Sequence, residues 1–317
     1  MSNPAIDIRI EKYRAEDKTA WDDFVAESKN GTFLFFRDFM EYHSDRFTDH
    51  SFLFFLNNKL IALLPANIEN NILYSHQGLT YGGLILSAYT KAAHVLHIFD
   101  CFKTFASHNN ISKIIYKTVP YIYHKQPSEE DLYALFRNDA QLTGRGISSC
   151  IDLQNPIWYS ELRERGIKKA KEKSLLIKES TSFDRFWKIL EENLQNRYNV
   201  SPTHTLNEIE YLKSKFPDNI RLFEVWNPTS ILGGCITFET LTTRHIQYIS
   251  ASEDGKKDNV LDFLFDYLIL DSRNKFKYFD FGISTEKNGL FLNEGLISQK
   301  EGFGARAIVY DIYELTI

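Results

Sequence analysis

The sequence predicts an α/β (α+β) protein built from two similar domains in tandem. Three observations support this prediction. Strand-type and helix-type segments alternate along the chain, the second half repeats the order of the first, and 317 residues suffice for about two domains of ordinary size. Each domain is expected to contain a mixed central sheet flanked by helices, with a cleft between the domains.

The first half contains segments in the order β-α-α-β-β-β-α-β-α-β. Alternating apolar residues predict the first strand at 6–13, and apolar residues at helical spacing predict a helix at 17–28. The turn sequences Asn57-Asn58 and Asn70-Asn71 separate three consecutive strands. The other predicted helices are 38–47, 91–108 and 128–136, and the other predicted strands are 51–56, 59–68, 72–75, 112–118 and 147–153.

The second half repeats this order. Ser182 is a typical N-cap for a helix at 182–198, and Thr205 with Glu208 forms a capping-box pattern for the next helix. Residues 258–273 are apolar almost all round and predict a buried helix. The remaining elements are strands at 175–179, 220–226, 232–239, 245–251, 277–281 and 306–314, a polar loop at 252–257 and a short helical segment at 290–299.

The repeated order predicts where the domains divide. A charged helix at 155–172 is expected to act as a linker. We therefore expect an N-terminal domain at 1–153, a linker helix at 154–173 and a C-terminal domain at 174–317.

Composition excludes several classes of protein. No stretch approaches about 18 uninterrupted apolar residues, and residues 1–7 lack the basic and apolar blocks of a signal peptide. A formal net charge of −5 argues against an extended nucleic-acid surface. Three cysteines without a paired spacing fit a reducing cytoplasm, and His94 with His97 lacks a third ligand, so we expect no metal site.

Two patterns near the C-terminus carry a resemblance to a known family. Residues 280–284 read Asp-Phe-Gly-Ile-Ser and residues 300–304 read Lys-Glu-Gly-Phe-Gly, with Gly289 between them. This ending resembles that of FemAB-like tandem GNAT proteins, and the element order resembles the GNAT acyltransferase fold. Residues 42–47, 75–83, 202–204 and 293–296 resemble the N-acyltransferases of bacterial surface-polysaccharide clusters.

The resemblance implies an enzyme that moves an acyl group from acyl-CoA to the amino group of a nucleotide-linked deoxyamino sugar, with dTDP or UDP as the nucleotide. Such an enzyme would serve O-antigen, lipopolysaccharide or capsule synthesis in the cytoplasm as a monomer or homodimer. It would need no metal, no extended nucleic acid and no membrane insertion. The N-terminal domain would hold the acceptor, and the C-terminal domain the acyl-CoA.

Residues for acyl-CoA are expected where a strand, a loop and a helix start meet. The loop would bind pyrophosphate through free main-chain N–H groups, and the strand end would hold the pantetheine arm. The loop departs from the usual Gln/Arg-x-x-Gly-x-Gly/Ala pattern by having a single glycine, and an ordinary solvated turn is the alternative. The predicted residues are Ile249, Ser250, Ala251, Gly255, Lys256, Lys257, Asn259, Asn293 and Lys300; an ion pair with Asp280 is the alternative role for Lys300.

His204 and Asn193 are the predicted catalytic residues. A histidine in a loop between two helices is suited to take the proton of the amine. The alternatives are a structural histidine, or no side-chain base at all. The predicted acceptor-binding residues supply aromatic rings and cations for a nucleotide, with glycines beside them: Tyr42, His43, Arg46, His76, Tyr81 and Arg197.

Two other functions stay open at this point. One is Fem-type transfer of an amino acid from charged tRNA to a peptidoglycan precursor. The other is a non-catalytic protein that binds a nucleotide sugar, because a fold does not by itself establish a function.

Overall fold

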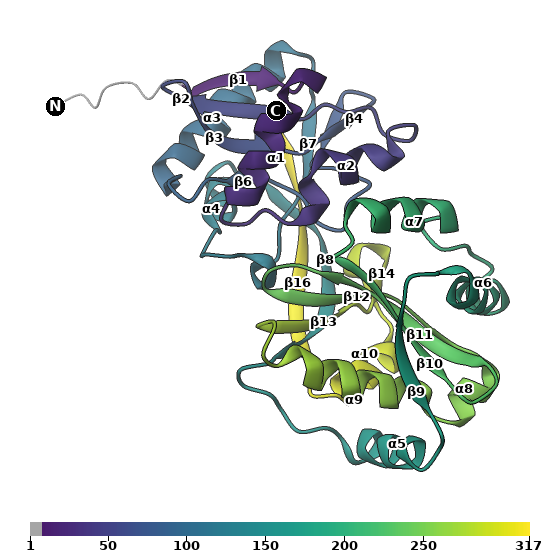
Figure 1. Cartoon of the computed structure of the whole chain (residues 1–317). Coiled ribbons are helices and arrows are strands. Elements are labelled where there is room, and N and C mark those ends of the chain that lie inside the picture. Colours follow the sequence, from purple (N-terminus) through teal and green to yellow (C-terminus); the bar gives the residue numbers. More distant parts are fainter. Residues whose placement is uncertain (1–7) are drawn as a thin grey trace. The chain divides into compact units, whose positions relative to one another are not determined.

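The computed structural model describes residues 8–317, without the side chain of Tyr198, and divides into two compact units (Figure 1). Within the described residues, unit 1 contains the chain up to Gly146 together with Glu286–Phe291 and Val309–Ile317, and unit 2 contains Ile147–Thr285 and Leu292–Ile308. These units are not contiguous in sequence: residues 309–317 belong to unit 1, and residues 154–173 to unit 2. The boundaries 1–153, 154–173 and 174–317 stay a prediction.

Unit 1 contains two sheets. The first is antiparallel in the order β1-β2-β3-β6, and the second runs β4-β5-β7-β16-β8. Its strands are β1 (Ile8–Lys12), β2 (Phe52–Leu56), β3 (Lys59–Leu64), β4 (Asn67–Glu69), β5 (Ile72–Tyr74), β6 (Ile85–Leu86) and β7 (Lys113–Lys117). Its helices are α1 (Lys18–Glu27), α2 (Arg37–Met40), α3 (Ala92–His108) and α4 (Glu130–Arg137), with short 3-10 turns at Ala15–Asp17, Phe33–Phe35, Glu41–His43 and Tyr121–Tyr123.

Unit 2 has the strand order β8-β13-β12-β11-β10-β9. The strands are β9 (Leu176–Ser180), β10 (Ile220–Trp226), β11 (Ile231–Glu239), β12 (Thr243–Ala251) and β13 (Tyr278–Ile283). The helices are α5 (Glu161–Lys171), α6 (Asp184–Tyr198), α7 (Leu206–Lys215), α8 (Glu253–Lys257), α9 (Val260–Ser272) and α10 (Glu294–Glu301). The long strands β8 (Gln141–Asp152) and β16 (Arg306–Thr316) have residues in both units; β14 (Thr285–Glu286) pairs with β15 (Phe291–Leu292).

One feature of the topology is common to both units. In each unit, antiparallel strands are followed by a parallel pair, and the two strands of this pair are joined by a crossover connection that contains a helix. In unit 1 this pair is β5 with β7, and in unit 2 it is β12 with β13. The predicted α/β class, with mixed sheets and flanking helices, is therefore confirmed.

Each unit has its own aromatic core. In unit 1, Phe52, Phe54 and Phe102 pack edge to face between the first sheet and α3. In unit 2, Phe265 of α9 packs on Phe279 and Phe281 of β13. Such ring pairs add to the stabilisation that burial of their area provides.

Helix α5 packs beside helix α9 (Figure 1), and charged side chains join the two helices. Arg163 and Lys171 of α5 donate hydrogen bonds to Asp262 and Asp266 of α9, at 2.5 and 2.7 Å. The helices approach closely at Gly166, where a Cβ atom would lie 1.9 Å from an Asp262 carboxylate oxygen. The segment expected to be a linker is thus packed against unit 2.

Several predicted elements differ from the structure in their bounds. The predicted helix at 155–172 begins only at Glu161, because Pro156 precedes it and the Ser160 hydroxyl caps it. The predicted strand at 59–68 is broken at Pro65 into β3 and β4. The predicted helix at 38–47 is four residues of α2 followed by a 3-10 turn. Ile6, the predicted start of the first strand, lies outside the described residues.

One local prediction was wrong. The predicted loop at 252–257 is helical, because the Ser252 hydroxyl accepts a hydrogen bond from the Gly255 N–H and caps α8. Most residues of helix α9 are buried, as predicted, although Tyr267 and Leu270 are exposed. The capping box of Thr205 and Glu208 is confirmed.

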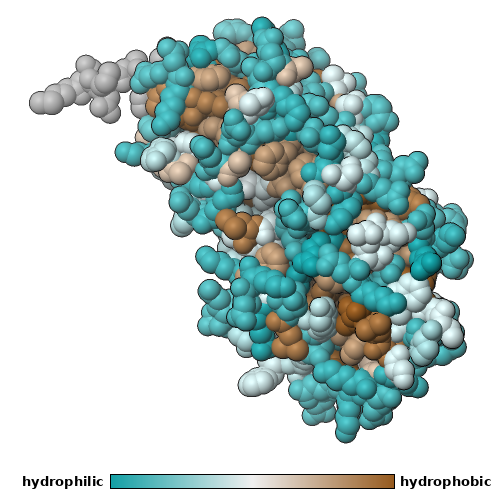
Figure 2. Space-filling view, in the orientation of Figure 1, coloured by the Kyte–Doolittle hydropathy of each residue, from teal (hydrophilic) through white to brown (hydrophobic). Residues whose placement is uncertain are grey.

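The visible face of the molecule is mostly hydrophilic, with separate hydrophobic groups in both units (Figure 2). Among the helices in residues 8–317, none is long and apolar enough to cross a membrane.

Arg244 holds β12 in place. The guanidinium is fully buried and donates to Glu239 of β11 at 2.8 Å and to Asp271 and Ser272 at the end of α9, at 2.9 Å each. A buried charge needs such partners, because removal of one partner leaves the other unpaired.

We therefore expect Arg244→Met to lower the free energy of unfolding by about 3–5 kcal/mol, since Glu239 would keep a buried charge. Urea unfolding followed by circular dichroism would measure the change. Arg165→Met, at an exposed position on α5, is the matched control and should change stability little. Equal stability of the two variants would contradict this account of Arg244.

Candidate functional site

In unit 2 the parallel strands β12 and β13 separate after a short paired stretch. Thr243 to His245 of β12 pair with Tyr278 to Asp280 of β13, whereas β12 continues its pairing with β11 as far as Ala251. Gly282 has a φ of +78°, which turns β13 away and which side chains other than hydrogen rarely permit. In the described strand pairings, β12 pairs with β13 only as far as His245. Beyond His245, the main-chain N–H and C=O groups of β12 that point toward β13 have no partner in the sheet, and such groups can bind a ligand.

A buried carboxylate lies at the last pair before this separation. Asp280 Oδ1 accepts a hydrogen bond from the Ser148 hydroxyl of β8 at 2.5 Å and one from the Gly282 N–H at 3.2 Å. Asp280 Oδ2 lies 2.8 Å from Nδ1 of His245. The carboxylate is fully buried. Through these hydrogen bonds it connects β13 with β8 and β12.

Lys300 of α10 fixes the strand end beyond Asp280. Its ammonium donates to the main-chain carbonyls of Gly282 at 2.8 Å and Ile283 at 2.9 Å. Burial lowers the pKa of Lys300 to about 8, although the nearby Asp280 charge acts in the opposite direction. Lys300 therefore supports the turn of β13 through main-chain contacts.

His204 lies on the face of β12 that α6 covers. Its Nδ1 lies 2.6 Å from the Tyr248 hydroxyl, and its main-chain N–H donates to the same oxygen at 3.2 Å. The Trp187 ring of α6 packs edge to face on Tyr248. The hydroxyl can donate to Nδ1 or accept from it, because its oxygen has two lone pairs in addition to its proton.

Asn193 joins α6 to the end of β12. Its amide nitrogen donates to the Ser250 hydroxyl at 2.7 Å and to the Ala251 carbonyl at 2.9 Å, and its oxygen accepts from Lys256 at 3.0 Å. Arg197, one turn further along α6, is exposed. Asn193 is thus a bridge between elements in this structure, and its predicted catalytic role stays a prediction.

The segment predicted to bind pyrophosphate uses its amides internally. The N–H groups of Gly255 and Lys256 donate to Ser252, and those of Asp258 and Asn259 donate to carbonyls of α8. Lys256 and Lys257 pair with the acidic side chains that precede them in α8. A Cβ atom on Gly255 would lie 2.2 Å from the Leu232 carbonyl, so this glycine allows close packing against β11.

Three further residues predicted to bind acyl-CoA have structural contacts. The Asn293 side chain caps α10 by accepting from the Leu296 N–H at 3.0 Å. Ile249 packs against the core of unit 2. Ser250, next to it, faces α6, where its hydroxyl donates to the Ile189 carbonyl at 3.1 Å.

Four of the predicted acceptor residues form one stack in unit 1. The Tyr42 ring lies parallel to His43 at 4.2 Å, His43 lies parallel to His76 at 5.1 Å, and the Arg46 guanidinium lies 5.4 Å from the Tyr42 ring centre. Burial lowers the pKa of His76 to about 3, with smaller contributions from His43 and Lys117. Tyr81 lies apart from the stack, with its hydroxyl on Thr32 at 3.1 Å.

In unit 1, side-chain contacts join the parallel strands β5 and β7 beyond their paired stretch, whereas in unit 2 the strands β12 and β13 separate there. Beyond β5, Ser75 accepts from the Lys117 N–H of β7 at 2.7 Å. The Lys117 ammonium then donates to the carbonyls of His76, Gln77 and Leu79, at 3.3, 3.1 and 2.6 Å. The space beside the strand ends of unit 1 is therefore filled by the protein itself.

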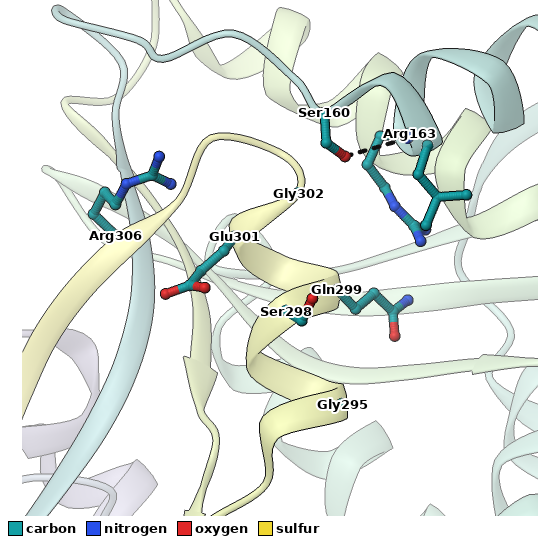
Figure 3. Close-up of a pocket in the computed structure, with 9 residues that line it drawn as sticks. Ser160, Arg163, Gly295, Ser298, Gln299, Glu301, Gly302 and Arg306 are labelled. Atoms are coloured by element: carbon teal, nitrogen blue, oxygen red, sulfur yellow. Dashed lines mark hydrogen bonds between the residues drawn. The ribbon is translucent and has the colours of Figure 1, made fainter.

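Two surface cavities of unit 2 do not contain the predicted residues. One, of about 1040 Å³, lies between α10 and the start of α5 (Figure 3). Of its polar groups, Ser160 caps α5 and Arg163 is paired with Asp262. The other, of about 330 Å³, lies beside the exposed Trp158.

Sequence reasoning did not single out His245, Ser148 or Lys117. Asp280 was part of the quoted C-terminal pattern, but its two side-chain partners are 35 and 132 residues away along the chain. The sequence offered one indication of these residues, which is a polar side chain within a strand whose other residues are mostly apolar. Among residues 8–317, no group of three His, Cys, Asp or Glu side chains is placed to hold a metal ion.

Comparison with known proteins supports the fold. No protein-family model matches the sequence, and a search of curated proteins finds no match. The solved structure of FemX matches with a TM-score of 0.68 and 10% identity, covering 97% of this chain and 97% of that chain. L-PGS from Bacillus licheniformis matches with a TM-score of 0.61 and 12% identity, covering 95% and 91%.

A third structure is a tandem GNAT protein from the clavulanic acid biosynthesis pathway, with a TM-score of 0.53, 9% identity and 98% of each chain covered. The fold is that of the tandem GNAT proteins. This agrees with the fold expected from the C-terminal pattern and the element order. Identities this low establish the fold and leave the activity to be inferred from the site.

The closure of unit 1 by Lys117 makes a pH-dependent prediction. Burial lowers the pKa of Lys117 to about 8 from 10.5, so the unfolded chain binds more protons than the folded protein between these values. The stability contributed by this group therefore rises with pH through that window. Relative to Lys117→Met, the wild type should gain roughly 2 kcal/mol of unfolding free energy between about pH 7.5 and pH 10.

Urea unfolding of both proteins across this pH range would measure the difference, in which other titrating groups cancel. Lys59→Met, at an exposed lysine, is the control and should show no such slope. Parallel curves for the wild type and Lys117→Met would contradict the assignment.

Proposed function

We propose that the protein transfers an acyl group from an activated donor to an amine, and that the donor carbonyl binds where β12 and β13 separate. The observation that carries this proposal is the contrast between the units. In unit 2 the parallel pairing ends at His245 and Asp280, whereas in unit 1 Lys117 closes the corresponding place. Unit 2 is therefore the donor side.

The reaction requires few groups from the protein. The amine nitrogen attacks the donor carbonyl, the new C–N bond forms, and the bond to the thiolate or alkoxide leaving group breaks. Main-chain N–H groups at a strand gap suit the negative oxygen that develops, because they are oriented before the reaction begins. The amine must lose a proton, and the leaving group must gain one.

For the substrates, we propose acyl-CoA as donor and a nucleotide-linked deoxyamino sugar as acceptor. This proposal is supported by the sequence patterns at 42–47, 75–83 and 280–304. The stack in unit 1 agrees with a nucleotide acceptor, since Arg46 is exposed beside the Tyr42 ring and could meet a diphosphate.

A specific observation favours a second donor. The N–H groups of Gly255, Lys256, Asp258 and Asn259 are already hydrogen-bonded, and both lysines of α8 are paired with its acids. Pyrophosphate bound at these groups would have to displace these contacts. An aminoacyl-tRNA, as in Fem-type transfer, has no pyrophosphate to place there.

A donor and acceptor panel tests the proposal. We expect thiol release from acetyl-CoA or 3-hydroxyacyl-CoA when a dTDP- or UDP-amino sugar is present, measured with a thiol reagent. Radiolabel transfer from aminoacyl-tRNA to a UDP-linked peptidoglycan precursor is the parallel arm. Activity in the second arm alone would replace the CoA donor, and no transfer in either arm, with nucleotide-sugar binding by calorimetry, would indicate a binding protein.

Substitution of the two α8 lysines would further distinguish acyl-CoA from aminoacyl-tRNA as the donor. If α8 rearranges to hold pyrophosphate, the double variant Lys256→Met/Lys257→Met should weaken CoA binding by about tenfold, or about 1.4 kcal/mol. Calorimetry with CoA would measure this, and Lys275→Met, three residues beyond the end of α9, is the control. An unchanged CoA affinity would place the pyrophosphate elsewhere.

A further inference from the structure

We propose that His245 accepts the proton of the attacking amine through Nε2, and that Asp280 and Ser148 position its ring for this step. This inference rests on the proposed transfer function and adds a catalytic residue to it. It starts from a continuous set of hydrogen bonds, from Ser148 to Asp280 to His245, at the point where the strands separate.

The hydrogen bonds determine which ring nitrogen carries the proton. Asp280 Oδ1 accepts from the Ser148 hydroxyl and from the Gly282 N–H, both of which are donors, so the carboxylate acts as an acceptor. A carboxylic acid is a far stronger acid than an imidazole N–H, so the shared proton belongs to Nδ1 of His245. The Nε2 atom then has a lone pair that can take a proton.

Asp280 is suited to stabilise the charged ring as well. It is fully buried, and burial strengthens its attraction to an imidazolium. The Ser148 hydroxyl is itself buried and keeps the carboxylate in one orientation. An aspartate that orients a histidine and stabilises its cation is a recurring catalytic arrangement on unrelated folds.

The position of the ring fits this role. His245 is the last β12 residue paired with β13, and 11% of its side chain is exposed, whereas Asp280 is fully enclosed. Gly282 passes beside the ring: a Cβ atom there would lie 3.3 Å from His245 Cε1 and 3.9 Å from Nε2. The absence of a side chain at Gly282 leaves the Nε2 side of the ring unobstructed by this residue.

The proton step is balanced within the proposed transfer. Nε2 takes a proton from the substrate ammonium, so the amine becomes neutral and the ring becomes an imidazolium. The amine nitrogen forms the C–N bond to the donor carbonyl, and the bond to the leaving group breaks. The leaving thiolate or alkoxide takes a proton from the imidazolium, which returns the ring to its neutral form, and the second proton that the nitrogen loses when the amide forms passes to water.

This assignment differs from the one that the sequence suggested. His204 lies on the same side of β12, but its Nδ1 contacts the Tyr248 hydroxyl, whereas Nδ1 of His245 contacts a buried carboxylate. A neutral phenol stabilises an imidazolium less than a carboxylate does. The two histidines therefore make opposite predictions for one experiment.

Two further titratable groups face this cluster. Cys150 of β8 lies opposite Asp280 in the strand register, and Lys300 of α10 lies beside Gly282. Burial raises the pKa of the Cys150 thiol, so it stays protonated, and burial lowers the pKa of Lys300 to about 8. Because Nε2 must be unprotonated to accept a proton, activity that depends on His245 would fall on the acidic side of the pH–rate profile.

The test uses the full chain with whichever donor and acceptor are active in the panel. We expect His245→Gln to lower kcat by about 10²–10⁴-fold and to abolish the acidic limb of the kcat profile. Asp280→Asn should lower kcat strongly with little change in KM, because it removes the preferred tautomer. Ser148→Ala should have a smaller effect, of less than about tenfold, since Asp280 keeps the Gly282 N–H.

Two controls accompany these variants. His108→Gln, at an exposed site at the end of α3, should leave kcat and its pH profile unchanged. His204→Asn should retain the acidic limb. Circular dichroism and urea unfolding would identify any variant that fails to fold.

Nitrogen NMR of histidine-labelled wild type provides a measurement without any variant. The expected result is a neutral His245 with its proton on Nδ1. A proton on Nε2, or loss of the acidic limb in His204→Asn but not in His245→Gln, would overturn the assignment to His245. A wild type that transfers nothing from any donor would instead overturn the proposed function, and the role of His245 with it.

Discussion

The buried carboxylate of Asp280 is the constraint on which the strand arrangement of unit 2 depends. A charge with no solvent exposure is stable only when donors surround it, and here the donors come from Ser148 on β8, His245 on β12 and the main chain at Gly282. These contacts hold three strands in register at one point. Beyond that point Gly282 turns β13 away, so the carboxylate both joins the strands and defines where they part.

The two units show how one topology can be open or closed. Each has antiparallel strands, a crossover with a helix, and one parallel pair. In unit 1, the Lys117 ammonium occupies main-chain carbonyls that would otherwise face the gap. In unit 2, Lys300 makes the same kind of contact, but with carbonyls of the departing strand itself. In unit 1 a lysine thus ties the segment after β5 to β7, whereas in unit 2 the Lys300 contacts involve β13 alone.

Local patterns in the sequence predicted local structure well. Asn57, Asn58, Asn70 and Asn71 all adopt positive φ in the turns where they were expected, because asparagine tolerates this region. The prediction failed at 252–257, where a serine cap outweighed a polar, glycine-containing composition. Long-range partnerships were beyond reach: nothing in the residues near His245 indicates Ser148, and the Lys117 contacts join segments about forty residues apart. The fold therefore followed from periodicity, while the site depends on pairings between distant strands.

The long strands β8 and β16 have a consequence for how the chain is made. Residues 309–317 belong to unit 1, where Ile312 to Thr316 pair with β7 across roughly two hundred intervening residues. A ribosome releases the chain from its N-terminus onward, and domains generally fold as units while synthesis continues. Unit 1 cannot complete its sheet in that order. β16, the strand that pairs with β7, is synthesised only after all of unit 2. Unit 1 is therefore begun first and completed last. Until residues 309–317 are synthesised, the edge of β7 that pairs with β16 stays unpaired, and an unpaired strand edge can pair with other chains and lead to aggregation.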